Sequence, residues 1–189
     1  MTTLMDETTQ MHLENVRSKD KDLQNAAFAY LMAATAVPVA WAYEAWVDVV
    51  AGLSDKDNRV RAISAQVFCN LAMSDPEKRM LTDFDKLLLV TKDERFVTAR
   101  HCLQALWKVG LAGSAQQEMV IAGLNGRYQE CITEKNYTLI RYDIIQDLKN
   151  LYDVIQDEQI KENALALIHI EEDLKYRKKY ATIWRENKK

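Results

Sequence analysis

The residues of this sequence whose types are best suited to chemistry are a histidine next to a cysteine and several close carboxylates. His101 and Cys102 would form a base and a nucleophile if their side chains met. Neighbouring residues on a helix point about 100° apart, however, so these two side chains do not share a proton. Three clusters of neighbouring carboxylates are candidates for acid–base catalysis: Asp55 with Asp57, Asp83 with Asp85, and Glu171 with Glu172 and Asp173. We expect them to be solvated charges in loops and on exposed helix faces.

Motifs for metal, phosphate or cofactor binding do not occur in the sequence. No two of the five glycines stand in a phosphate-binding loop, and the three histidines lie far apart without an H-E-x-x-H spacing. The cysteines Cys69, Cys102 and Cys131 also lie far apart, without a C-x-x-C pair. We therefore expect buried free thiols in a reducing, cytoplasmic environment, and a protein that is not an enzyme and holds no metal or cofactor.

The composition and the charge pattern favour packed helices with a basic tail. The 189 residues include five Gly and two Pro, too few for many tight turns or sheet corners. No apolar stretch is long enough to span a membrane, and the polar N-terminus does not have the form of a signal peptide. The net charge is −3, but residues 175–189 carry +6 and the rest of the chain carries −9.

A frame of about forty residues recurs along the chain. It repeats an apolar residue followed by a polar one, in four copies: Leu23-Gln24, Val60-Arg61, Ala99-Arg100 and Ile140-Arg141. The steps from 24 to 61, from 61 to 100 and from 100 to 141 are 37, 39 and 41 residues. Seven positions after each copy, the frame places a large apolar residue between helices: Leu31, Phe68, Trp107 and Leu148. Such a period predicts pairs of amphipathic helices that bury their apolar stripes against one another.

The spacing of Asp55, Val60 and Arg61 resembles the start of the second helix in the HEAT-repeat family. The resemblance covers about residues 10–155. It implies an all-α fold, a right-handed αα superhelix of about four helix pairs plus a C-terminal helix, in one domain over residues 1–189. It also implies that Arg61, Arg100 and Arg141 form a ladder that links neighbouring repeats.

The patterns also predict where elements begin and end. Apolar stripes predict partner helices near residues 42–53, 80–88 and 114–124, the last stopped by Asn125-Gly126. A final helix is expected from about Asp157 to Arg185, with residues 175–189 as its basic extension. Residues 1–9 are expected to be flexible.

One side of the second helices predicts a binding groove. If the stripe through Val60 and Phe68 faces the core, the positions in register with Arg61 lie on the opposite side of each helix. They form a line that changes from apolar to basic: Phe28, Met32, Arg61, Arg100, Gln104, Lys108, Arg141 and Lys149. On a body of net −9, this line predicts a groove for an acidic segment of a partner. In the alternative, the arginines pair with loop acids such as Asp55 and Asp93 and leave the groove electrically neutral.

The basic tail offers a second candidate surface. Tyr176, Tyr180 and Trp184 are four residues apart and share one helix face, and Lys178 and Lys179 are among the cations around them. In one interpretation, this aromatic stripe covers the open end of the repeat stack. In the other, these five residues bind an acidic or phosphate-bearing partner by stacking and charge.

The combined features favour a non-enzymatic binding or scaffold module that holds a protein or peptide partner, and an acidic one in particular, on its surface. The alternative is a nucleic-acid-binding or DNA-base-repair protein on a helical-repeat scaffold. The acidic body argues against nucleic acid, and the basic tail leaves that alternative open. The HEAT-like lyases that attach bilins are a third class, but no residue here indicates a tetrapyrrole site. The sequence predicts no contact with membranes and leaves the oligomeric state open.

Overall fold

The described part of the chain folds into α-helices joined by short loops. The computed structural model describes residues 4–185. Over this range there are ten α-helices, three 3-10 segments and no strand, so the prediction of an all-α fold is confirmed. The α-helices are α1 (Glu7–Asn15), α2 (Lys21–Ala34), α3 (Ala42–Gly52), α4 (Asn58–Leu71), α5 (Met80–Val90), α6 (Phe96–Ala105), α7 (Ser114–Glu130), α8 (Tyr137–Ile155), α9 (Glu158–His169) and α10 (Leu174–Ile183). None of them has both the length and the apolar character needed to cross a membrane.

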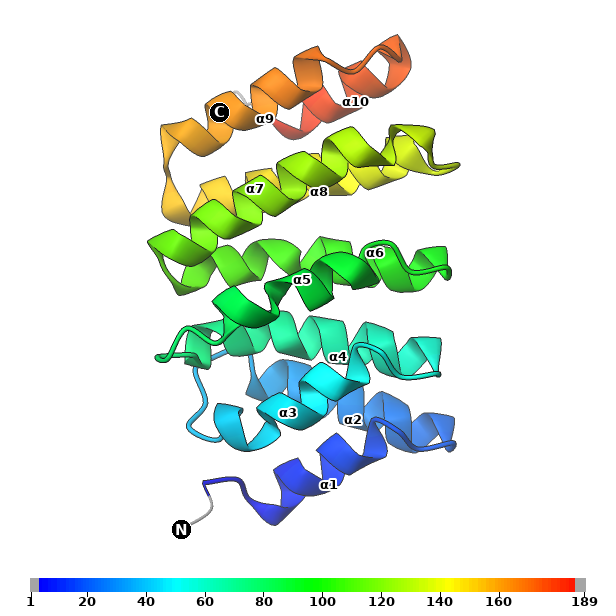
Figure 1. The fold of residues 1–189 in the computed structure, drawn as a ribbon, viewed down its shortest axis with the longest axis vertical. Helices are drawn as coiled ribbons and strands as arrows, with labels where there is room; N and C mark the ends of the chain where they lie inside the picture. The colour runs from blue at the N-terminus through cyan, green and yellow to red at the C-terminus, as the bar shows by residue number, and fades with distance from the viewer. Residues whose placement is uncertain (1–3, 186–189) are drawn as a thin grey trace.

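The helices form two rows. Figure 1 shows the odd-numbered helices in front, which we call the first row, and the even-numbered helices behind them, which we call the second row. Each first-row helix packs beside the second-row helix that follows it in the chain, which gives five helix pairs. Neighbouring second-row helices contact one another without a break from α2 to α10. The first row is packed more loosely, and grooves lie between α1 and α3, between α3 and α5, and between α7 and α9.

Aspartates begin half of the helices. The N-caps of α1, α2, α4, α9 and α10 are Asp6, Asp20, Asp57, Asp157 and Asp173. The carboxylate of each accepts a hydrogen bond from a backbone N–H of the first turn. Such a bond satisfies a donor that has no partner inside the helix, and it typically stabilises the helix by about 1 kcal/mol. In a chain with little Gly or Pro, these aspartates mark where five of the ten helices of the described chain start.

Two second-row helices end in 3-10 segments. α4 continues into Ala72–Ser74, and α6 continues into the longer segment Leu106–Ala112. In the longer segment Leu106 is fully buried against neighbouring helices, whereas Trp107 is half-buried. A register of 3.6 residues per turn does not extend into a segment with about 3.0 residues per turn. The prediction that Trp107 occupies the position equivalent to Phe68 is therefore wrong.

One hydrophobic core runs through the stack. Phe68 on α4 is fully buried, and its ring centroid lies 4.9 Å from that of Trp46 on α3 in an edge-to-face arrangement. α7 approaches α5 closely at Gly123, where a Cβ atom would lie 2.9 Å from Cε1 of Phe84. A residue without a side chain is therefore needed at this contact between two first-row helices.

The C-terminal region differs from the prediction of one long helix. α9 ends at His169 and α10 begins after a loop over residues 170–173, so there are five helix pairs and not four pairs with a final helix. Acids stabilise this loop: Oε1 of Glu171 accepts a hydrogen bond from the backbone N of Asp173 at 3.0 Å, and Asp173 caps α10. The predicted basic extension is thus largely a separate helix, and residues 186–189 lie outside the described part.

Two other boundaries differ from the prediction. α7 continues through Gly126 to Glu130, because the buried Arg127 anchors the last turn and a glycine inside a helix costs only about 1 kcal/mol. Residues 7–9 were expected to be flexible, but they belong to α1. The chain before α1 is held there by a hydrogen bond of 2.6 Å from the backbone N of Leu4 to Glu44. Residues 1–3 lie outside the described part.

Replacing Phe68 by Ala is expected to lower the free energy of unfolding by about 3–5 kcal/mol, because it removes a fully buried ring and leaves a cavity. Replacing Trp107 by Ala is expected to cost less, because the Trp107 ring keeps part of its surface in water. Urea denaturation of the two variants measures the difference. Equal losses would contradict this register of the second row.

Candidate binding surface

Arginines of the second row bind acids of the helix pair that follows. Arg61 on α4 makes a two-point contact with Asp93, in the loop between α5 and α6: Nε to Oδ2 is 2.6 Å and Nη2 to Oδ1 is 3.0 Å. Nη1 of Arg61 donates to the carbonyl of Asp55 at 2.8 Å. Burial disfavours the charged form of Asp93 and is the largest single effect on it. The hydrogen bonds from Arg61 and from the backbone N–H of Arg95, with the positive charges of both arginines, together outweigh burial and lower the pKa of Asp93. The contact therefore joins the second helix pair to the third.

The same kind of contact recurs at the next two intervals. Arg100 on α6 binds Asp143 on α8 through Nε at 2.7 Å and Nη2 at 2.8 Å. Arg141 on α8 binds Glu171, in the loop between α9 and α10, at 2.9 Å, and both side chains are buried. Arg141 also donates to the carbonyl of Tyr128 at 3.1 Å. We call these contacts the arginine ladder: Arg61–Asp93, Arg100–Asp143 and Arg141–Glu171.

The predicted groove is therefore not an open row of free charges. Arg141 is only 5% exposed, so its predicted place on an open face is wrong: its side chain turns into the stack to meet its acid. The other predicted groove residues are half-buried or exposed on the second row: Phe28, Met32, Arg61, Arg100, Gln104, Lys108 and Lys149. Lys108 donates to the side chain of Asn70 at 3.1 Å, and Lys149 pairs with a carboxylate one turn further along α8.

The aromatic stripe of the tail packs against α8. Tyr180 is fully buried and donates to a backbone carbonyl of α8 at 2.6 Å. Trp184 is 8% exposed, and its ring centroid lies 5.3 Å from that of a tyrosine of α8. A partner does not reach these two rings, so the prediction that they are contact residues is wrong. Tyr176 is half-buried, and Lys178 and Lys179 are exposed, so these three remain accessible.

Residues predicted for the groove and for the tail come together at one hollow. It has a volume of about 400 Å³ and lies between α6, α8 and α10. Its lining residues are Arg100, Leu139, Tyr142, Tyr176, Lys179 and Thr182, and we call it the second-row hollow. The sequence analysis missed Leu139, Tyr142 and Thr182. Leu139 and Tyr142 could have been found from the sequence, because they flank Arg141, one of the recurring arginines.

The second-row hollow has an excess of positive charge. Arg100 is 33% exposed and is neutralised by Asp143. Nζ of Lys179 lies 4.7 Å from the ring centroid of Tyr176, a cation–π contact, and no carboxylate of residues 4–185 pairs with it. No acidic residue is among those that line the hollow. The arrangement is suited to an anionic group.

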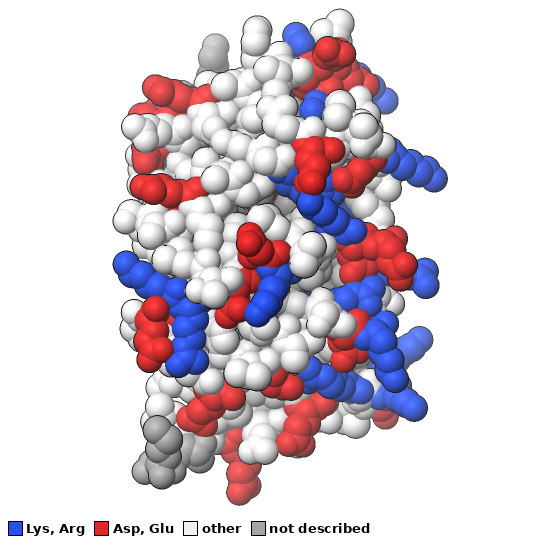
Figure 2. All heavy atoms as spheres, viewed as in Figure 1, with Lys and Arg blue, Asp and Glu red and all other residues white. Residues whose placement is uncertain are grey.

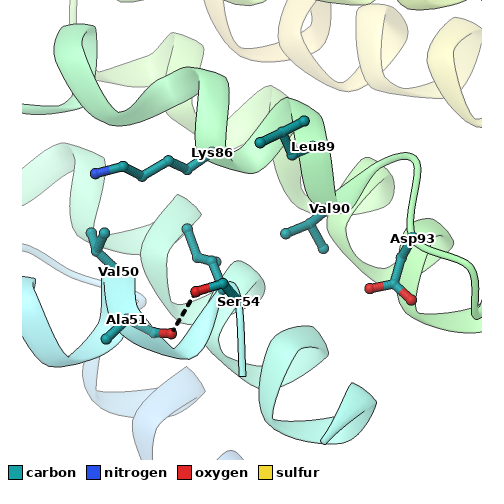
Figure 3. A pocket seen from close by; sticks show the side chains of 8 residues that line it. Val50, Ala51, Ser54, Lys86, Leu89, Val90 and Asp93 are labelled. Carbon is teal, nitrogen blue, oxygen red and sulfur yellow. Dashed lines mark hydrogen bonds between the residues drawn. The ribbon is translucent and has the colours of Figure 1, made fainter. Parts of the chain in front are cut away.

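The first row offers an apolar groove instead. The groove between α3 and α5 has a volume of about 420 Å³ and is walled by aliphatic side chains such as Val50 and Leu89 (Figure 3). Its charged residues already have partners: Nζ of Lys86 lies 2.6 Å from Asp83, and Asp93 belongs to the arginine ladder. Acids and bases lie next to one another over the middle of this face (Figure 2). The groove therefore has no unpaired charge with which to select a partner.

The candidate catalytic groups do not meet. Cys102 is fully buried, with its Sγ 3.4 Å from a backbone carbonyl of α5, and His101 is exposed. Burial raises the pKa of the Cys102 thiol well above its ordinary value, which disfavours the nucleophilic thiolate. The expectation of solvated carboxylates is wrong for Glu171, which is buried, and for Asp83, which accepts a hydrogen bond from Trp46 at 2.9 Å. Within residues 4–185, no three His, Cys, Asp or Glu side chains are grouped so as to hold a metal ion.

One buried acid takes no part in the arginine ladder. Asp147 on α8 is 1% exposed, and its Oδ2 has no hydrogen-bond partner among the described residues. Burial, with a contribution from the negative charge of Asp143, raises the pKa of Asp147 well above its usual range. The folded protein therefore keeps a proton on this side chain under conditions in which the unfolded chain loses it.

Replacing Arg141 by Ala is expected to lower the free energy of unfolding by about 3–5 kcal/mol, because Glu171 would stay buried without a positive charge to pair with. Replacing Arg17 by Ala is the control, since it breaks only more exposed ion pairs, with Asp48 and Asp55, and the expected cost is about 1 kcal/mol or less. Urea denaturation measures both values. Similar values for the two variants would contradict the structural role of the ladder.

The variant Asp147→Asn tests the buried proton. An aspartate in the unfolded chain loses its proton near pH 4, whereas Asp147 keeps its proton in the folded protein. The wild type should therefore lose stability relative to the variant as the pH rises above about 4. Free energies of unfolding from urea titrations between about pH 4 and 7 measure this trend. A difference that stays constant over the range would show that Asp147 ionises normally in the folded protein.

No protein-family model and no curated protein matches this sequence. The function is therefore inferred from three structural features: the paired helices, the arginine ladder and the second-row hollow.

Proposed function

We propose that this protein is a non-enzymatic binding module, built as a right-handed superhelix of HEAT-like repeats, that holds an acidic protein partner on its second row. The observation that carries the proposal is the arginine ladder, which recurs at three successive intervals between helix pairs. An arginine that leaves one repeat to bind an acid of the next is what the HEAT-like spacing around Arg61 implies. The ladder arginines also keep that frame, at steps of 39 and 41 residues.

The ladder supports a binding role because it favours one arrangement of the second row. A two-point contact between an arginine and a carboxylate is satisfied over a narrow range of distance and orientation. Arg61 and Arg100 each make such a contact with the helix pair that follows. These contacts hold side chains on α6 and α8 in place before a partner arrives. A preorganised surface loses less conformational entropy on binding.

Charge favours the second row over the first. Lys175, Lys178 and Lys179 on α10 are exposed, and none of them pairs with an acid of residues 4–185. In the first-row groove between α3 and α5, by contrast, Lys86 and Asp93 both have ion-pair partners. An unbalanced surface charge steers and selects partners of the opposite sign. The lysines of α10 therefore support an acidic partner on the second row.

A catalytic role has less support from the same geometry. The side chain of His101 is exposed to solvent, whereas that of Cys102 is buried in the core, so the two do not meet. An ionised acid that binds an arginine has no proton to donate, and this applies to the ladder acids. Hydrogen-bonding groups that converge on an anion without reacting with it are typical of recognition.

Site-specific photocrosslinking tests the proposal. Benzoylphenylalanine is introduced in place of Tyr142, which it resembles in shape, on the second row. The matched control carries the same group in place of Val47, which is 76% exposed on the first-row helix α3. In native lysate we expect crosslinks to a partner protein from position 142 and none from position 47.

Two outcomes would count against the proposal. Crosslinks from position 47 alone would contradict the choice of the second row. If neither position yields a crosslinked protein, although circular dichroism shows that both variants are folded, the binding role itself would be contradicted.

A further inference from the structure

We infer that the second-row hollow binds a single carboxylate, from an Asp or Glu side chain, together with an apolar side chain next to it in an extended segment of the partner protein. The inference rests on the proposed function and adds to it the chemistry of the segment that is recognised. It is carried by three features of the hollow: its donors, its net charge and its rigid aromatic wall.

Donors for a carboxylate come from two helices. Arg100 uses Nε and Nη2 to bind Asp143, which leaves Nη1 without a hydrogen-bond partner in the described chain. Lys179 is exposed at the rim, with its Nζ 4.7 Å from the ring centroid of Tyr176. Hydrogen bonds from charged donors to a carboxylate are the strong ones, and they gain strength where water is partly excluded. A carboxylate in the hollow would meet these donors and no acidic lining residue.

The charge of the hollow matches one carboxylate. Arg100 and Lys179 contribute two positive charges and Asp143 cancels one, which leaves a net charge of +1. A carboxylate neutralises this charge, whereas a phosphate group at neutral pH carries about −1.5 to −2 and would leave an excess of negative charge. The match favours an unmodified acidic residue over a phosphorylated one.

The remaining wall is apolar and rigid. The rings of Tyr142 and Tyr176 lie 6.3 Å and 6.2 Å from the ring of Tyr180, which is fully buried and holds both of them. Leu139 adds aliphatic surface. Aromatic side chains fixed in this way offer a large contact area at little cost in conformational entropy. The neighbour of the acidic residue is therefore expected to be aliphatic or aromatic.

A peptide fits the surrounding charges better than a nucleic acid does. Binding to duplex DNA needs several phosphate contacts, and the affinity grows with the number of them. Outside residues 175–189 the chain has a net charge of −9, which repels a polyanion. A short peptide segment needs positive charge only where its carboxylate enters the hollow, and Lys175 and Lys178 on α10 lie nearby for any further acidic residue of the segment.

Fluorescence anisotropy with the full chain tests the inference. The probe is a short fluorescein-labelled peptide of alternating Glu and Leu. Two matched peptides replace either every Glu by Gln or every Leu by Ser. We expect the Glu-Leu peptide to bind, and each matched peptide to bind at least tenfold more weakly, because one lacks the charge and the other lacks the apolar neighbour.

Variants locate the binding at the hollow. Lys179→Glu is expected to weaken binding of the Glu-Leu peptide by about tenfold or more, equivalent to about 1.4 kcal/mol. Lys19→Glu makes the same change in net charge at an exposed lysine before α2, far from the hollow in the stack, and should change the affinity less than about twofold. Both lysines are exposed, so the melting temperatures should stay close to that of the wild type.

An unchanged affinity in Lys179→Glu, or an equal loss in Lys19→Glu, would overturn the assignment to the hollow. Tighter binding of a labelled duplex DNA that also depends on Lys179 would overturn the choice of a peptide. Photocrosslinking from position 142 does not depend on the sequence of the bound segment. A crosslinked partner without binding of the Glu-Leu peptide would therefore overturn this inference and leave the proposed function standing.

Discussion

The contact on which the rest of the second row depends is that of an arginine with an acid of the next helix pair. Buried ion pairs add little net stability, because the loss of water around both charges offsets most of their attraction. Their main effect is on geometry. A buried arginine that has lost its acid strongly destabilises the folded state, so arrangements of the helices that separate the two side chains are disfavoured. Arg141 and Glu171 show this most clearly, since both are buried and Arg141 also binds a backbone carbonyl. The ladder therefore favours one alignment of the second to the fifth helix pairs.

This alignment also places the candidate binding surface. Glu171 is held by Arg141 through one carboxylate oxygen and by its own loop through the other. The loop fixes where α10 starts, and Tyr180 then fixes α10 against α8. Tyr176 and Lys179 are carried on this helix to the hollow that Arg100 borders. The buried contact between Arg141 and Glu171 thus helps to place the side chains of α10 that line the second-row hollow.

The sequence predicted the helices better than the side-chain contacts between them. Amphipathic stripes and the recurring frame were enough to predict pairs of helices, and Asp93 was foreseen as a possible partner of an arginine, which Arg61 binds. The partner of Arg100 was not foreseen, because Asp143 lies on a helix more than forty residues away and only packing brings it near. Glu171 was taken for a solvated charge because a run of acids usually is one, and burial depends on neighbours that the local sequence does not reveal. The second-row hollow was missed for the same reason: it combines side chains from three helices.

The 3-10 segment after α6 has a consequence for the length of the second row. A 3-10 helix rises about 2.0 Å per residue and an α-helix about 1.5 Å. Residues 96–112 comprise ten α-helical and seven 3-10 residues, so they extend about 29 Å, where an α-helix of the same residues would extend about 26 Å. The nineteen residues of α8 also extend about 29 Å. The 3-10 winding therefore makes up for the two residues by which residues 96–112 are shorter than α8, and the two helical segments reach nearly the same length.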